Sequence, residues 1–378
     1  MQKLKLMTII GTRPEIIRLS AVIKKADQYF DHVLVHTGQN WDYTLNEVFF
    51  NDLGLREPDY YLDSAGADLG ETMGTIISKT YALLRDVAPD ALLLLGDTNS
   101  TLSAIPAKRL KIPIFHMEAG NRCWDWNVPE MINRTVVDHI SDINLPYTEN
   151  SRRYLLSEGI DGKTVFVTGS PMPEVLSSNK ASIEASNILD RLGIKPKQYF
   201  LLSAHREENI DDEQHFLSLM TGVNEIAETY GLPVIFSTHP RSAAVIAAHN
   251  FKLHPLVQSM QPFGFFDYNK LQQESYCVLS DSGTLSEESA ILVFPGVLIR
   301  TSTERPEALD CGSIIIGGVT GGDITRAVQL SVQMNAQGAT YRLPIDYQEM
   351  NVSDKVIRII ESYAKIVNIT TWQKTKSD

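Results

Sequence analysis

The chain has few cysteines and no long apolar stretch. Its 378 residues include three scattered cysteines, Cys123, Cys277 and Cys311, whose positions match neither a metal-binding spacing nor a disulfide framework. No stretch approaches the roughly 20 apolar residues that span a bilayer. The N-terminal residues lack the apolar core and small-residue cleavage site of a signal peptide. These absences predict a protein of the reducing cytoplasm with no membrane partner.

The chain also lacks excess positive charge and the common phosphate-binding fingerprints. Its formal net charge is −12, whereas a nucleic-acid-binding protein needs a basic face to displace phosphate counterions. The composition therefore argues against a nucleic-acid partner, although a few arginines in one site still attract a small anion. Neither a GxGxxG dinucleotide fingerprint nor the GK[ST] ending of a Walker loop occurs. The histidines have no short metal-type spacing, so the sequence predicts no metal site.

What the chain does contain is a repeated alternation of short apolar runs with longer helix-like segments. The apolar runs are continuous, which is typical of strands covered by helices on both faces of a sheet. The pattern therefore predicts an α/β protein with two doubly wound parallel sheets, one in each of two domains. The expected strands read LKLMTII, HVLVHTG, ALLLLGD, PIFHMEAG, DINLPYT and VFVTGS, and then YFLLSAH, PVIFSTH, CVLSDSG, GVLIRTS and SIIIGG.

A change in composition separates the two sets of runs. The segment 170–198 is richer in Pro, Ser, Asn and Lys than its neighbours. We therefore expect a first domain over residues 1–172 and a second over residues 173–355. A last helix over residues 356–378 would close the second domain or pack on the first. Its expected apolar face consists of Val356, Ile359, Ile360, Tyr363 and Ile366.

Polar residues collect where the predicted strands end, and ligands of such sheets bind outside the carboxyl ends of the strands. After the first strand, GTRPE places Arg13 beside the free amide groups of a helix start, which suits a phosphate. In the second domain, SDSGTLSEES repeats the arrangement with Ser282 and Gly283. Taken alone, GTRPE slightly favours an ordinary turn with a solvated arginine. The glutamates of the second segment equally complement a helix dipole.

Histidines and arginines follow three neighbouring strands of the second domain. His205 lies in SAHREEN, His239 in STHPRS and Arg305 in STERPE. A single histidine is more often structural than functional. Two histidines that end equivalent strands, each followed by an arginine, indicate a group of donors for an anion.

Two carboxylates end neighbouring strands of the first domain. Asp97 ends ALLLLGD and Glu118 ends PIFHME, and adjacent strands of a sheet lie about 5 Å apart. Glu130 supplies a third carboxylate, while Arg122 and Arg134 follow the two glutamates. We interpret this group as a pocket in which carboxylates exchange protons and arginines hold an anion. Taken alone, Asp97 is better explained as a helix N-cap, and the loop equally as a solvated acidic surface.

Several of these motifs occur together in the order and approximate spacing of one known family. GTRPE, LGDT, EAG-x-R, PE-x-x-NR, AHRE, DSG-x-x-x-EE and TERPE extend from Gly11 to Arg305. In these seven motifs the chain resembles the non-hydrolysing UDP-N-acetylglucosamine 2-epimerases. The resemblance implies the GT-B fold, in which two Rossmann-like domains face across a cleft and the C-terminal helix crosses back to the first domain.

The resemblance also implies a reaction and its partners. It implies an isomerase that acts on a UDP-N-acetylhexosamine without nicotinamide, metal or another cofactor. UDP and the carbon-2 proton leave to form a 2-acetamidoglycal, and both then return with the opposite configuration at carbon 2. The family resemblance further suggests a homodimer.

Roles for individual residues follow from the matching motifs. The resemblance implies that Asp97, Glu118 and Glu130 are acid/base carboxylates and that His205 is an essential histidine. It implies a substrate- and UDP-binding set that consists of Arg13, Arg18, Arg134, His239, Tyr268, Ser282, Gly283, Glu288 and Arg305. Within this set, Glu288 corresponds to the glutamate that binds the ribose.

Three departures from the family pattern indicate one of its branches. Arg18 stands where the family usually has a lysine, and the loop NRCWDWNV is shorter than the common form. The segment GQNWDY replaces a GQH-type segment that helps to bind an activating second substrate, so allosteric activation is not expected. These features resemble the branch that makes UDP-N-acetyl-L-fucosamine from UDP-2-acetamido-2,6-dideoxy-L-talose for capsule and O-antigen.

The substrate of this branch lacks the hydroxyl group at carbon 6, which requires a less polar pocket there. Trp124 and Trp126 of the short loop would form the apolar wall of this pocket. Alternatively, both side chains pack beneath the loop. The alternatives are the common UDP-N-acetylglucosamine 2-epimerase, a hydrolysing epimerase, a GT-B glycosyltransferase and a non-catalytic nucleotide-sugar sensor.

Overall fold

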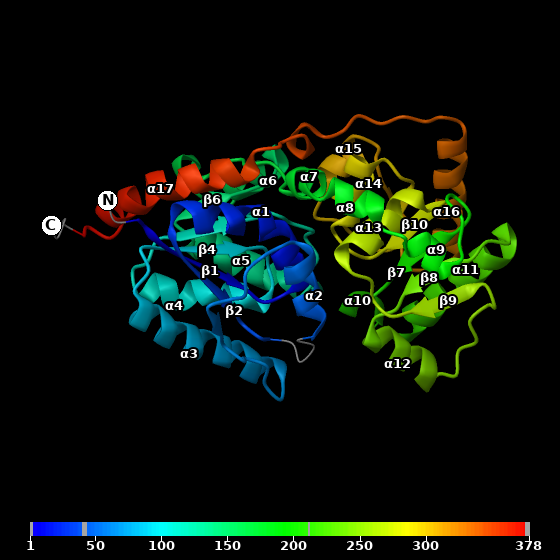
Figure 1. Cartoon of the computed structure of the whole chain (residues 1–378), viewed down its shortest axis with the longest axis horizontal. Helices are drawn as coiled ribbons and strands as arrows, with labels where there is room; N and C mark the ends of the chain where they lie inside the picture. The colour runs from blue at the N-terminus through cyan, green and yellow to red at the C-terminus, as the bar shows by residue number, and fades with distance from the viewer. Residues whose placement is uncertain (1–2, 40–43, 211, 375–378) are drawn as a thin grey trace. The chain divides into compact units, whose positions relative to one another are not determined.

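The computed structural model describes residues 3–39, 44–210 and 212–374. The chain forms two compact units, of which one consists of Met1–Ser178 with Gln348–Asp378 and the other of Asn179–Tyr347. Figure 1 shows both units with their helices and strands labelled.

The first unit is built on a parallel sheet with the strand order β3-β2-β1-β4-β5-β6. The order reverses between β1 and β4, which is the switch point at which sheets of this kind bind ligands. The register pairs Leu95 with Met117, so β4 and β5 end side by side. The strands are β1 (Lys5–Ile10), β2 (Asp31–His36), β3 (Tyr60–Tyr61), β4 (Ala91–Leu95), β5 (Ile114–Met117) and β6 (Ile143–Leu145).

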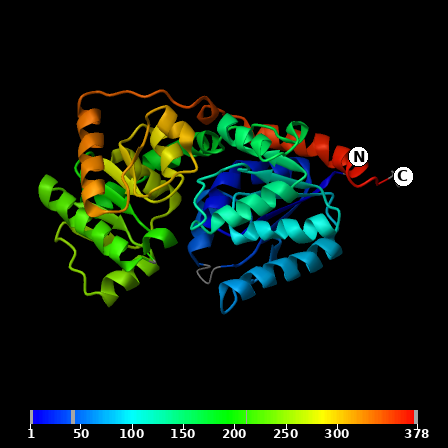
Figure 2. The ribbon, with the colours of Figure 1, turned by 180° about the vertical axis from the view of Figure 1, so that it is seen from behind.

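Helices cover both faces of the first sheet, as Figure 1 and the view from behind in Figure 2 show. One face carries α1 (Arg13–Tyr29), α7 (Met172–Ser178) and α17 (Val352–Thr370), and the other carries α3 (Leu69–Val87), α4 (Ala104–Arg109) and α5 (Glu130–Ile140). Every residue of β4, which reads ALLLL, is buried. Burial from both sides explains why this strand is apolar throughout. The unit also contains α2 (Thr44–Asp52), α6 (Glu149–Ser157), η1 (Asn99–Ser103) and η2 (Gly162–Thr164).

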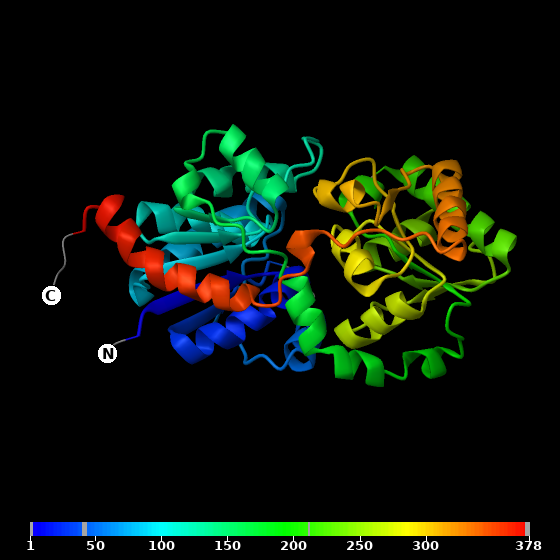
Figure 3. The same ribbon diagram turned by 90° about the horizontal axis from the view of Figure 1, so that it is seen from above.

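The C-terminal helix α17 packs along α1 (Figure 3). Val356 and Ile360 are buried as the apolar pattern predicts. Ile366 is 43% exposed, while Ala364 and Val367 are buried in its place. The predicted apolar face is therefore wrong in its last turns, because the buried positions there follow the i, i+4, i+7 spacing from Ile360.

The second unit repeats the topology of the first. Its sheet has the order β12-β11-β10-β7-β8-β9, which is the same order when the strands are counted from β7. The strands are β7 (Phe200–Ser203), β8 (Val234–Ser237), β9 (Val257–Met260), β10 (Cys277–Ser280), β11 (Gly296–Leu298) and β12 (Ile315–Ile316). The described strand pairs of both sheets are parallel.

The helices of the second unit also form two layers. On one face α11 (Glu213–Tyr230) packs against α16 (Gly321–Ala336), and on the other α13 (Phe265–Glu274) packs against α8 (Lys180–Ala185) and α9 (Ile188–Leu192). The remaining helices are α10 (Glu207–Ile210), α12 (Pro240–Ala248), α14 (Leu285–Leu292), α15 (Pro306–Asp310) and η3 (Ile345–Tyr347). Among the described residues, no helix has the length and apolar character needed to cross a membrane.

The α/β class with two doubly wound parallel sheets is thus confirmed, but one predicted strand is wrong and two strands were missed. VFVTGS is no strand, since Val165 makes only an isolated bridge to Asn144. Phe166 instead packs against Tyr363 of α17, with the rings tilted and their centroids 4.8 Å apart. The edge strands β3 and β9 were not predicted, because an edge position does not require a continuous apolar run.

Candidate active site

Asp97 and Glu118 leave the same edge of the first sheet, directly after the neighbouring strands β4 and β5. The backbone turns sharply at both places. Gly96 has a φ of 74°, and Glu118 itself has a φ of 63°. A glutamate in this left-handed region is uncommon, and such strain collects at functional sites.

Asp97 is held by the first turn and a half of α5. The Arg134 guanidinium contacts the Asp97 carboxylate through Nη2 at 2.5 Å and through Nε at 2.6 Å. The Asn133 amide donates a hydrogen bond to the Asp97 carbonyl oxygen at 2.9 Å. The PE-x-x-NR motif therefore fixes both the backbone and the carboxylate of Asp97.

Glu118 has a different arginine. Arg18 of α1 forms an ion pair with the Glu118 carboxylate, and both side chains are more than nine-tenths buried. The Asn121 amide donates a further hydrogen bond to Glu118 Oε1 at 3.1 Å. In an interior of low dielectric constant, removing one partner of such a pair leaves an uncompensated charge. The arginine that replaces the usual lysine thus contacts a proposed acid/base group.

Arg122 serves the structure of the loop rather than an anion. Its side chain is buried, and Nη1 lies 2.7 Å from Asp138 while Nη2 lies 2.7 Å from Glu158. His116 of β5 also contacts Asp138, at 2.9 Å. Burial by itself would raise the pKa of Asp138, but His116 and Arg122 hold that pKa below its ordinary value. The interpretation that both arginines of this segment hold an anion is therefore wrong for Arg122.

Glu130 and Arg13 both stand at the first residue of a helix. Glu130 begins α5 and is half-buried. Arg13 begins α1, where its guanidinium carbon lies 6.0 Å from the centroid of the Phe49 ring. The helix start predicted at GTRPE is confirmed, and Pro14 occupies its first turn.

Glu15 is a buried carboxylate of the same motif that was not predicted. It accepts hydrogen bonds from the Gly11 amide at 3.0 Å, from the Thr12 hydroxyl at 2.8 Å and from the Ser100 hydroxyl. It therefore joins the loop after β1 to the loop after β4. Burial raises the pKa of Glu15 to about 7, and the hydrogen bonds oppose this shift. The spacing T-x-x-E, typical of a capping box, is the signal that identifies it in the sequence.

In the second unit, His205 and His239 follow the neighbouring strands β7 and β8. Their ring centroids are 6.2 Å apart. His239 is the N-cap of α12, and its Nδ1 accepts a hydrogen bond from the Arg241 amide at 3.3 Å. His205 is partly exposed, and its Nδ1 lies 3.1 Å from the carboxylate of Asp281.

The loop between β10 and α14 holds Ser282 and Gly283. The Ser282 hydroxyl lies 2.9 Å from the Thr284 hydroxyl. Further along, the Gln272 amide donates a hydrogen bond of 2.6 Å to Glu288, which is largely buried. Helix α14 therefore brings the turn and the glutamate of the DSG-x-x-x-EE motif to one end of the sheet.

Two other predicted binding residues are tied to partners inside the second unit. Burial raises the pKa of Tyr268, and the hydrogen bonds of its hydroxyl with Ser203 and Ser280 oppose that shift. Arg305 is 3% exposed, and its Nε and Nη2 each lie 3.3 Å from Glu287 Oε2. The buried partner Glu287 was not predicted for this role, because the pairing depends on the fold of the loop between them.

The sequence and structure comparisons identify the family. The family model described as UDP-N-acetylglucosamine 2-epimerase matches residues 23–361. The chain belongs to the UDP-N-acetylglucosamine 2-epimerase family. This membership confirms the predicted enzyme class, an isomerase of the non-hydrolysing 2-epimerase type.

Individual relatives agree with this membership over most of the chain. The UDP-2,3-diacetamido-2,3-dideoxy-D-glucuronate 2-epimerase of Pseudomonas aeruginosa is 34% identical over 338 residues, which cover 88% of this chain and 94% of the relative. The structure of UDP-N-acetylglucosamine 2-epimerase from Rickettsia bellii has 44% identity and a TM-score of 0.91, with 99% and 100% of the two chains covered. The Methanocaldococcus jannaschii UDP-GlcNAc 2-epimerase, solved in complex with UDP-GlcNAc and UDP, has 31% identity and a TM-score of 0.89, with coverages of 95% and 99%.

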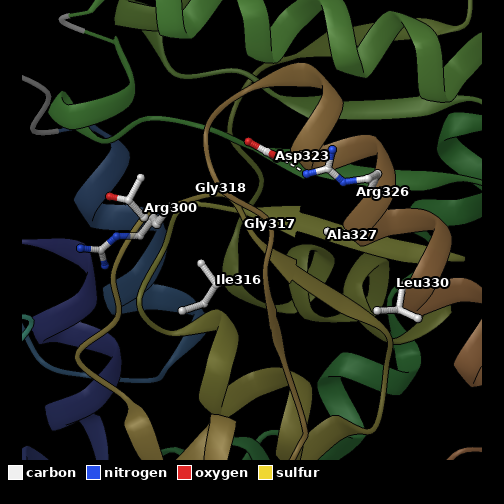
Figure 4. Close-up of a pocket in the computed structure, with 9 residues that line it drawn as sticks. Arg300, Ile316, Gly317, Gly318, Asp323, Arg326, Ala327 and Leu330 are labelled. Carbon is white, nitrogen blue, oxygen red and sulfur yellow. Dashed lines mark hydrogen bonds and ion pairs between the residues drawn. The ribbon is translucent and has the colours of Figure 1, made fainter.

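A pocket of about 600 Å³ lies in the second unit of this epimerase, at the ends of β11 and β12 (Figure 4). Asp323 and Arg326 line one wall of the pocket and form an ion pair with one another. Arg300, which also lines it, forms an ion pair with Glu304 at 2.8 Å. The two arginines that line the pocket, Arg300 and Arg326, therefore have acidic partners within the second unit. The described lining residues are Arg300, Thr301, Ile316, Gly317, Gly318, Asp323, Arg326, Ala327 and Leu330, and they include none of the predicted site residues.

Proposed function

We propose that this epimerase inverts carbon 2 of a UDP-N-acetylhexosamine. Membership in the 2-epimerase family supports the reaction class. The observation that carries the proposal is the placement of Asp97 and Glu118 at the ends of adjacent strands, each with its own arginine. Two carboxylates on one edge of a sheet suit the removal of a proton and its return.

The proposed chemistry assigns different tasks to different residues. The carbon-2 proton is barely acidic, so a carboxylate removes it only while the anionic leaving group departs. Asp97, Glu118 and Glu130 are the proposed carboxylates. Donors for UDP, such as His205 and Ser282, stabilise the charge that grows on the diphosphate. UDP then adds back to the glycal as a proton arrives on the other face.

The finer proposal is that the substrate is UDP-2-acetamido-2,6-dideoxy-L-talose, which becomes UDP-N-acetyl-L-fucosamine. The short loop NRCWDWNV and Arg18 support this choice. Trp124 and Trp126 are 58% and 64% exposed, so they do not pack beneath the loop. The rings of Trp124 and Tyr154 meet edge to face, with 5.5 Å between their centroids. These indoles remain open to an apolar part of a ligand.

The competing substrate is UDP-N-acetylglucosamine, which the names of the Rickettsia bellii and Methanocaldococcus jannaschii relatives favour. The test is to incubate the purified protein separately with each nucleotide sugar and to follow products by NMR. We expect faster turnover of the 6-deoxy-L-talo sugar, with no stoichiometric release of UDP. Faster turnover of UDP-N-acetylglucosamine overturns the finer proposal alone. Steady accumulation of UDP and free sugar identifies a hydrolysing enzyme instead.

Four further predictions belong to this proposal. They are a cytoplasmic location, a homodimer, a role in capsule or O-antigen synthesis, and the lack of allosteric activation. The last prediction depends on the segment GQNWDY, of which residues 40–43 lie outside the described part of the chain.

A further inference from the structure

Asp281 holds the loop that carries His205. It directly follows β10 and is fully buried. Its Oδ2 accepts hydrogen bonds from the amides of His205 at 2.7 Å and Arg206 at 2.8 Å, and from the Asn209 side chain at 3.1 Å. One carboxylate oxygen therefore fixes the start of the segment after β7 to the end of β10.

The other oxygen of Asp281 faces the ring of His205. Oδ1 lies 3.1 Å from Nδ1, and the His205 side chain is 40% exposed. A carboxylate in this place favours a hydrogen on Nδ1, because an ionised carboxylate only accepts hydrogen bonds. The remaining ring nitrogen, Nε2, is then the one left for a ligand.

The charged and titratable groups around this pair leave Asp281 ionised at neutral pH. Burial alone would raise the pKa of Asp281, but the neighbouring His205 ring and the amides of His205 and Arg206 lower it to about 2. The His239 ring faces His205 at 6.2 Å, and Tyr268 interacts with Asp281. Arg206 on the same loop lies 4.0 Å from Glu304.

We propose that Asp281 is the positioning residue of His205, holding its imidazole in one orientation with hydrogen on Nδ1. This inference rests on the proposed function, in which His205 serves the UDP-binding unit. With Asp281 on the Nδ1 side of the ring, Nε2 is the nitrogen that faces a ligand, and a protonated His205 donates from it to an anion such as a diphosphate. Asp281 acts through His205 and does not itself touch the substrate.

The test compares Asp281→Asn with the wild type by ¹⁵N NMR of the histidine rings and by the pH dependence of kcat. The His205 signals are assigned with His205→Gln. Asparagine preserves the shape of the side chain and an oxygen that accepts from the amides of His205 and Arg206. The atom that it turns toward Nδ1 is an amide nitrogen, which donates, or a neutral oxygen. We expect the neutral ring to change from Nδ1–H to Nε2–H. We also expect kcat to fall about 10- to 100-fold, with a changed pH profile.

Asn209→Ala is the matched control. It removes the third donor on the same Asp281 oxygen, together with the hydrogen bond of 3.0 Å to the Ile299 carbonyl, but it leaves the His205 ring untouched. It should lower stability without changing the tautomer or the pH profile. Equal changes in both variants would mean that Asp281 serves only the loop. That outcome overturns the proposal.

The wild-type spectrum tests the inference even if Asp281→Asn does not fold. A neutral wild-type His205 that carries its hydrogen on Nε2 contradicts the proposal without any variant. This measurement needs no substrate. A wild-type protein that turns over no UDP-N-acetylhexosamine would disprove the proposed function and leave the tautomer result standing.

Discussion

The buried and half-buried carboxylates of this epimerase have different partners. Asp97 and Glu118 each contact one arginine, Arg134 and Arg18, at the edge of the first sheet. Asp138 is enclosed by His116 and Arg122 and has no face left for a ligand. The sequence shows all of these residues, but their pairing depends on which strand ends and helix starts meet. Partner identity is therefore the part of the site that sequence motifs predict least well.

The first prediction concerns the proposed acid/base residues. Asp97→Asn and Glu118→Gln should each lower kcat by at least about 100-fold, because neither amide exchanges a proton at neutral pH. The Kd for UDP, measured by calorimetry, should change little. Glu158→Gln is the control, because it alters a carboxylate of the neighbouring structural ion pair. Loss of UDP affinity as large as the loss of rate in both variants would show that these residues are structural.

The second prediction concerns Glu15, whose pKa in the folded protein is about 7 against an ordinary 4.5. The folded state holds this proton more tightly than the unfolded state. The resulting stabilisation is fully present below pH 4.5 and is lost as the pH rises through 7, by up to about 3 kcal/mol.

Urea unfolding of the wild type and of Glu15→Gln, at a series of pH values from 4 to 8, measures this contribution. We expect the free energy of unfolding of the wild type to fall relative to that of Glu15→Gln as the pH rises. A difference that is independent of pH would mean that folding leaves the pKa of Glu15 unchanged.

At the scale of helices and strands, burial from both sides is what made the fold predictable. Central strands such as β4 and β10 are continuous apolar runs, and they stand out in the sequence. The edge strand β9 mixes buried Val257 with exposed Ser259, so it carries no such signal. Close packing of helices also leaves little trace in the sequence, since the pattern of apolar residues does not show how near two helix axes come.

The third prediction tests one such close approach, between α11 and α16. A Cβ at Gly222 would lie 2.6 Å from the Cα of Gly321, so Gly222→Ala forces the two backbones apart. Overpacking costs about 1–3 kcal/mol and outweighs the roughly 1 kcal/mol that alanine gains over glycine within a helix. Gly322→Ala is the matched control, because a Cβ there meets nothing within 4 Å. Urea unfolding should show a loss only for Gly222→Ala, and equal stabilities would contradict the packing described.

At the scale of the whole molecule, two units share one topology and carry different chemistry. Each sheet has its switch point between its first and fourth strands. The first unit holds the carboxylates with their arginines, and the second holds the histidines, the DSG turn and the buried Asp281. The sequence predicted both sheets and the family, since these depend on repeated apolar runs and on the order of motifs. The exact sugar is less predictable, because it depends on a few side chains of one short loop.

The most direct test of the account is the exchange of the carbon-2 proton with solvent. The wild-type epimerase is incubated in D₂O with UDP-2-acetamido-2,6-dideoxy-L-talose and, separately, with UDP-N-acetylglucosamine. The recovered nucleotide sugars are then analysed by NMR and mass spectrometry. Inversion through proton removal predicts one deuterium at carbon 2 of the inverted product from whichever sugar is turned over. Turnover that leaves carbon 2 without deuterium would contradict the proposed reaction.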